Sequence, residues 1–96
     1  MLTIENIKRA VAPLAKKYDI VKVDLFGSYA IGNATEKSDV DFLVLFNKKI
    51  PSIFNVMGFK AELEHNLKYS VDVVTLPLTR PDMINIDKVV SVYERP

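Results

Sequence analysis

Two apolar segments joined by a polar loop constrain the fold of this chain more than any other feature. The first covers residues 20–26 and ends at Gly27-Ser28, and the second opens with Asp39 and Asp41, two residues apart. Side chains on a strand alternate between its faces, so the two aspartates project to the same side. Like charges held together are unfavourable unless a cation lies between them. The pattern therefore predicts two strands that meet at a cation-binding site.

A third carboxylate lies farther along the chain, inside a β-branched run. Asp72 lies in the segment 71–76, which reads as a strand, and burial there without a partner is costly. If this strand lies beside the one containing Asp41, three carboxylates form a cluster. Oxygen ligands of this kind favour Mg²⁺ or Mn²⁺. Such a cluster suits nucleotidyl transfer with two metal ions roughly 3.5–4 Å apart.

These residues together resemble the signature of the DNA polymerase beta-type nucleotidyltransferase superfamily, over residues 21–75. At this length the chain most resembles the minimal nucleotidyltransferases (MNT), which include MntA-like antitoxins. The resemblance implies that Gly27 and Ser28 hold the β- and γ-phosphates of ATP. It also implies that Asp39 and Asp41 ligate two Mg²⁺ ions. Asp72 would then ligate the catalytic ion and help to deprotonate the acceptor hydroxyl.

The resemblance also implies an activity and a partner. We expect an enzyme that moves AMP from ATP to an acceptor hydroxyl, a tyrosine on a HEPN-type toxin, and so acts as its antitoxin. The alternative is a non-catalytic subunit that neutralises its partner by masking it, or that senses nucleotide without turnover. One departure from the family pattern concerns phosphate binding, because Ile31 stands where many relatives carry an arginine. Lys37 and Arg80 are the candidate replacements.

The composition fits one small globular domain covering residues 1–96. The chain is 49% hydrophobic and 26% charged, contains no cysteine and has a formal net charge of +1. A nearly balanced charge argues against a nucleic-acid partner. No apolar window reaches 18 residues, so we expect no membrane span, and we expect a cytoplasmic protein. So short a chain can complete its apolar surface in an oligomer or a hetero-complex.

The hydrophobic pattern predicts an α/β (α+β) fold: a small mixed β-sheet, with helices mainly on one face and the carboxylates near the other. A final helix is expected to turn Met83, Ile86, Val89 and Val90 inward. The first helix is expected over residues 4–18, capped by Thr3 and kinked or interrupted at Pro13. A second helix is expected over 53–68, capped by Ser52, with an apolar stripe that includes Ile53 and Met57. The other expected elements are strands over 20–26, 41–46 and 71–76, a helical turn over 28–31, and the final helix over 82–93.

Overall fold

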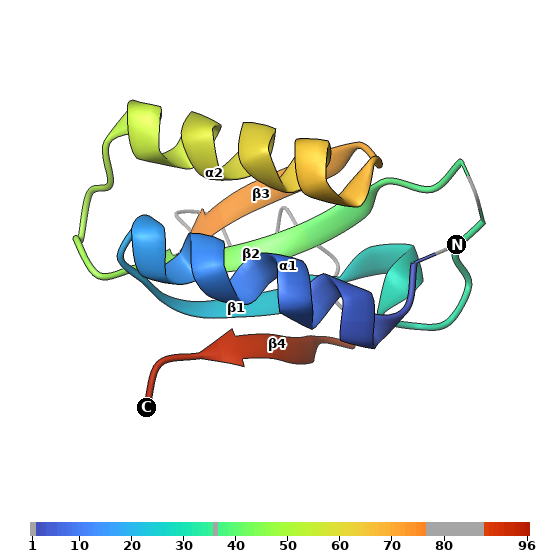
Figure 1. Cartoon of the computed structure of the whole chain (residues 1–96). Coiled ribbons are helices and arrows are strands. Elements are labelled where there is room, and N and C mark those ends of the chain that lie inside the picture. The colour runs from blue at the N-terminus through green and yellow to red at the C-terminus, as the bar shows by residue number, and fades with distance from the viewer. Residues whose placement is uncertain (1, 36, 77–87) are drawn as a thin grey trace.

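A computed structural model describes residues 2–35, 37–76 and 88–96 of the chain. Both helices cover one face of a four-stranded sheet (Figure 1). The core lies between the helices and that face. In chain order the elements are α1 (Ile4–Lys17), β1 (Ile20–Phe26), the 3-10 turn η1 (Gly27–Tyr29), β2 (Val40–Phe46), α2 (Ile53–Leu67), β3 (Val71–Leu76) and β4 (Val90–Glu94).

The sheet is mixed, as predicted, with strand order β3-β2-β1-β4. β2 and β3 run parallel and are joined by the crossover helix α2, whereas β1 pairs antiparallel with both β2 and β4. A parallel pair needs such a long connection, which explains why a helix separates these two strands in the sequence. β2 lies inside the sheet, and its apolar residues on both faces match that position.

Helix α1 begins at the predicted residue and buries Ile7, Val11, Leu14 and Ala15. The Thr3 hydroxyl accepts from the Asn6 backbone N–H at 3.1 Å, and the Asn6 side chain accepts in return from the Thr3 backbone. The predicted interruption at Pro13 is wrong, because the helix continues through it. Proline removes the bond to the carbonyl of Arg9, and both residues are exposed, so water can satisfy that carbonyl.

Helix α2 begins at the predicted residue, ends one residue before the predicted end, and has only part of the predicted apolar face. Its buried side chains are Phe59, Leu63 and Leu67, spaced by four residues. Ile53 and Met57 are instead 65% and 54% exposed, so the stripe was wrong at these positions. Met57 lies two residues before Phe59, which is about 200° around the helix and therefore points away from the core.

The C-terminal prediction is wrong where the structure describes it. Residues Val90–Glu94 form strand β4 rather than the end of a helix. Val89 is 44% exposed, whereas Val92 is buried in the core. The period of two in this β-branched run fits the open edge of β1, which supplies backbone hydrogen bonds that a helix would not use. Met83, Ile86 and the rest of residues 82–87 lie outside the described residues.

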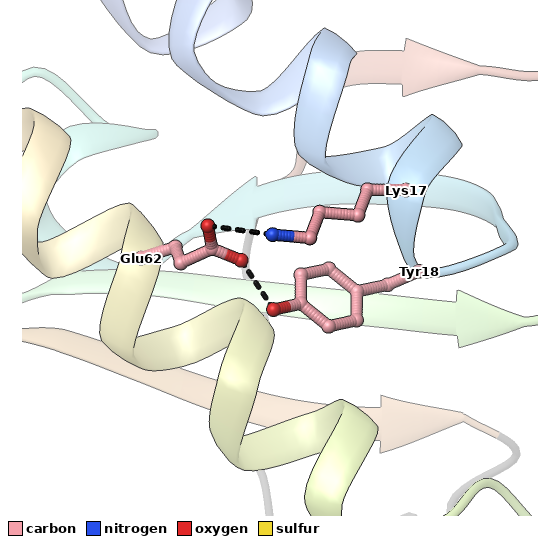
Figure 2. A network of polar contacts seen from close by, with 3 residues as sticks. All are labelled: Lys17, Tyr18 and Glu62. Atoms are coloured by element: carbon pink, nitrogen blue, oxygen red, sulfur yellow. Dashed lines mark hydrogen bonds and ion pairs between the residues drawn. The ribbon is translucent and has the colours of Figure 1, made fainter.

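A polar network ties the end of α1 to α2. The Lys17 Nζ lies 2.9 Å from Glu62 Oε1, and the Tyr18 hydroxyl donates to Glu62 Oε2 (Figure 2). Tyr18 also contacts the Phe59 ring edge-on, and Gly58 leaves room for it: a Cβ at Gly58 would lie 2.7 Å from the Tyr18 hydroxyl.

No helix among the described residues is long and apolar enough to cross a membrane.

Candidate active site

The turn at the end of β1 is pressed against Asp41. Gly27 has a φ of +76°, and a Cβ built on it would lie 2.2 Å from Asp41 Oδ2. Glycine is therefore required both for the backbone conformation and for the close approach. In the pairing of β1 with β2, Phe26 lies opposite Asp41, which fixes the turn at this end of the sheet. The end of the first predicted strand therefore meets the start of the second at Asp41.

The parallel pairing of β2 and β3 brings two of the predicted carboxylates together. Asp41 and Asp72 are register partners and so project from the same face of adjacent strands. Val40, Phe42 and Val44 belong to the core under the helices, which places Asp41 on the opposite face of the sheet. Asp41 is half-buried, whereas Asp72 is exposed. The separation of helices and carboxylates onto opposite faces therefore follows from the strand register.

The surroundings of Asp41 disfavour its charge. Burial, followed by the neighbouring Asp72 and then the charge of Asp39, raises the pKa of Asp41 from 3.8 to about 6. A divalent cation would offset both the desolvation and the repulsion, so the donor set suits Mg²⁺. Asp39 is exposed at the entrance to β2 and has the smallest effect of the three causes. As placed, no three acidic, histidine or cysteine side chains of the described residues surround a common metal position.

The turn that carries Ser28 is short and internally bonded. The Gly27 carbonyl accepts from the N–H groups of Ala30 and Ile31 at 3.1 and 3.3 Å, and the Ser28 carbonyl accepts from Asn33 at 2.9 Å. These bonds fix the conformation of the turn that follows Gly27 at the end of β1. Ile31 is 52% exposed and brings no charge to this turn.

A polar groove of about 590 Å³ adjoins Asp39. It contains Lys37, which is one of the two candidate replacements for the arginine. It also contains Lys68, which the sequence pattern did not single out. The signal for Lys68 was the parallel pairing itself, because parallel strands begin at the same edge of a sheet. The second candidate, Arg80, lies outside the described residues. The groove is lined by Lys37, Ser38, Asp39, Lys68, Tyr69 and Ser70.

Comparison with known proteins identifies the family. The family model described as "Polymerase beta, Nucleotidyltransferase" matches residues 8–93. The chain belongs to this nucleotidyltransferase family. Protein adenylyltransferase MntA of Thermococcus cleftensis is 37% identical over 78 residues, which cover 77% of this chain and 78% of that protein. A relative from Methanocaldococcus jannaschii, also named as a protein adenylyltransferase, is 35% identical over 88 residues. The match covers 88% of this chain and 94% of that protein.

Several solved structures share the fold. A structure described as a minimal nucleotidyltransferase has a TM-score of 0.71 and 32% identity, and covers 85% of this chain and 86% of its own. A toxin–antitoxin crystal structure with AMP-PNP has a TM-score of 0.76 at 20% identity, covering 92% and 73%. The Shewanella oneidensis complex of a tri-AMPylated HEPN toxin with its MNT antitoxin has a TM-score of 0.72 at 18% identity, covering 97% and 74%. The polymerase beta-like core that the sequence predicted is thereby confirmed.

Proposed function

We propose that this nucleotidyltransferase is an ATP-dependent protein adenylyltransferase. The observation that carries the proposal is the alignment of Asp41 with Asp72 on the open face, with Gly27 pressed against Asp41. The proposed phosphate-binding turn begins at Gly27, and Asp41 and Asp72 are two of the proposed metal ligands. The names of the two sequence relatives support adenylyl transfer as the reaction.

The proposed roles follow the chemistry of phosphoryl groups. Gly27 and Ser28 hold the β- and γ-phosphates, and Asp39, Asp41 and Asp72 hold two Mg²⁺ ions, with Mn²⁺ as a substitute. When bound, the metals neutralise phosphate charge and polarise the acceptor hydroxyl. The acceptor oxygen then bonds to the α-phosphorus, the bond from that phosphorus to the bridging oxygen breaks, and pyrophosphate leaves. Asp72, the exposed member of the pair, accepts the hydroxyl proton.

We further propose that the acceptor is a tyrosine of a HEPN-type toxin, which makes this chain the antitoxin of a pair. The support comes from structural neighbours, one described as a tri-AMPylated HEPN toxin with an MNT antitoxin and another as a toxin–antitoxin with AMP-PNP. The protein would act in the cytoplasm with that partner. The alternative, a subunit that neutralises the toxin only by covering it, does not need the costly charge of Asp41 beside Asp72.

Separate measurements of binding and transfer test the assigned roles. Asp72→Asn is expected to bind Mg·ATP with nearly the affinity of the wild type and to lose transfer, because the proton acceptor is gone. Asp41→Asn is expected to lose both, because it removes a ligand next to the phosphate turn. Asp19→Asn, at the far end of β1, is the matched control and should retain both properties. Full transfer by Asp72→Asn or Asp41→Asn would contradict the proposal.

A further inference from the structure

We propose that Lys37 and Lys68 bind the β,γ-phosphate tail of Mg·ATP in the groove beside Asp39. The inference deepens the proposed function and rests on it, because it assigns the phosphate-neutralising charge that Ile31 does not supply. It extends the nucleotide site from the Gly27-Ser28 turn across the entrance of β2 to the entrance of β3. The two lysines are positioning residues for the leaving pyrophosphate.

The fold joins two segments that are distant in the sequence. β2 and β3 are parallel, so their first residues lie at one edge of the sheet, as Figure 1 shows. The Val40 N–H donates to the Ser70 carbonyl at 2.9 Å, which ties the two entrances together. The residues just before each strand therefore line the same groove, with Lys37 contributed by the segment before β2 and Lys68 by the segment before β3.

Backbone hydrogen bonds flank both groove lysines. Lys68 ends α2 in the left-handed conformation, with φ of +64°, and its N–H donates to the Glu64 carbonyl at 2.8 Å. Before β2, the Ser38 hydroxyl accepts from the Thr35 N–H at 2.8 Å and the Ser38 N–H donates to the Thr35 carbonyl at 3.0 Å. These bonds join Thr35 and Ser38, which lie on either side of Lys37 in the chain.

The two ammonium groups are available for a ligand as far as the described residues show. Among those residues the ion pairs are Lys17 with Glu62, Lys22 with Asp24, and Arg95 with Asp19. Both groove lysines are exposed, and the groove also offers the hydroxyls of Ser38, Tyr69 and Ser70 as donors. Phosphate oxygens accept hydrogen bonds from all of these groups.

Asp39 lies in the same groove and favours a metal-bound phosphate over a free carboxylate as the ligand. A free carboxylate of an acidic peptide would be repelled by Asp39 at the groove wall. A phosphate tail carries its own Mg²⁺, which turns the same carboxylate into a ligand. A groove with two lysines and one carboxylate therefore fits a metal-bound polyphosphate better than an acidic segment of a protein acceptor.

Calorimetric titration without any acceptor tests the assignment. The probes are the Mg²⁺ complex of an ATP analogue with a methylene bridge between the α- and β-phosphorus atoms, and AMP. Each of Lys37→Gln and Lys68→Gln is expected to weaken analogue binding about tenfold, since a charge-assisted hydrogen bond contributes on that order, and the double variant about a hundredfold. AMP affinity should stay unchanged, because AMP has no β,γ tail. Lys37→Arg and Lys68→Arg should restore most of the analogue affinity.

Lys49→Gln, an exposed lysine beyond the other end of β2, is the matched control and should bind like the wild type. Analogue affinity unchanged in the double variant would overturn the assignment, as would equal losses for the analogue and AMP. Weakened binding of the partner protein with normal analogue binding would show that the groove serves the acceptor instead. A different result would contradict the proposed function alone: wild-type protein that binds the analogue through the two lysines but transfers no AMP to the acceptor.

Discussion

Asp41 carries a charge that its surroundings oppose. It is half-buried on the open face, with Asp72 as its strand partner and Gly27 against its carboxyl oxygen. Its raised pKa, about 6, means that the folded protein holds the proton more tightly than the unfolded chain, whose value is 3.8. The stability contributed by the protonated form is present below pH 3.8 and is lost as the pH rises through 6.

Asp41→Asn is therefore expected to stabilise the metal-free protein at pH 7.5, by about 1–2 kcal/mol after allowance for solvent screening. The gain should shrink toward pH 4, where the wild-type carboxyl is protonated as well. Denaturant unfolding at the two pH values, in the presence of a chelator, measures the difference. A gain that is the same at both pH values would contradict the assigned environment of Asp41.

Two glycines with the same backbone conformation provide a matched pair. Gly27 and Gly32 both have a φ of +76°, but a Cβ at Gly32 would meet no atom within 4 Å. Alanine at either position costs about 1–2 kcal/mol of backbone strain. Only Gly27→Ala also displaces the Asp41 carboxyl, so it alone should lose Mg·ATP binding. Comparable nucleotide binding by both folded variants would show that the close approach to Asp41 has no role.

At the scale of elements, the contact between α1 and α2 has a definite pH dependence. Hydrogen bonds from Tyr18 and then Lys17 lower the pKa of Glu62 below its usual 4.5, while the same contacts raise the pKa values of Tyr18 and Lys17. The Glu62 contribution to stability is present above pH 4.5 and is lost as the pH falls through the lowered value. The contributions of Tyr18 and Lys17 are present below pH 10 and are lost above their raised values.

Glu62→Gln should accordingly lower the melting temperature at pH 7, because it removes the ion pair with Lys17 and weakens the bond from Tyr18. The difference from the wild type should narrow at pH 3 and again above pH 11. Melting curves at the three pH values test this, with Glu94→Gln on the exposed end of β4 as the control. A pH-independent difference would indicate that Glu62 acts only through packing.

Most elements were predictable because their signals are local. The cap at Thr3, the cap at Ser52 and the apolar runs of β1, β2 and β3 depend on neighbouring residues alone. β4 was predicted as a helix because its partner, the free edge of β1, is a tertiary feature. The site shows the same division: Asp39, Asp41 and Asp72 follow from the sequence pattern, whereas Lys68 enters only through the parallel register of β2 and β3.

At the scale of the whole molecule, structure and proposed chemistry occupy opposite faces of one sheet. The helices bury the core face, and Asp41 and Asp72 lie toward the other face. Loss of a carboxylate should therefore leave the core unchanged. The catalytic antitoxin and the masking subunit thus predict the same folded molecule, and they differ in whether the carboxylates transfer AMP.

Transfer of label from α-labelled ATP to the protein encoded beside this chain tests that difference most directly. Wild type and Asp41→Asn are compared, with Mg²⁺ and then with a chelator. We predict that label reaches a tyrosine of the partner only with wild-type protein and Mg²⁺, and that the modified partner loses its toxicity. An unlabelled partner, neutralised equally by a tight complex with either variant, would contradict the account and establish masking as the function.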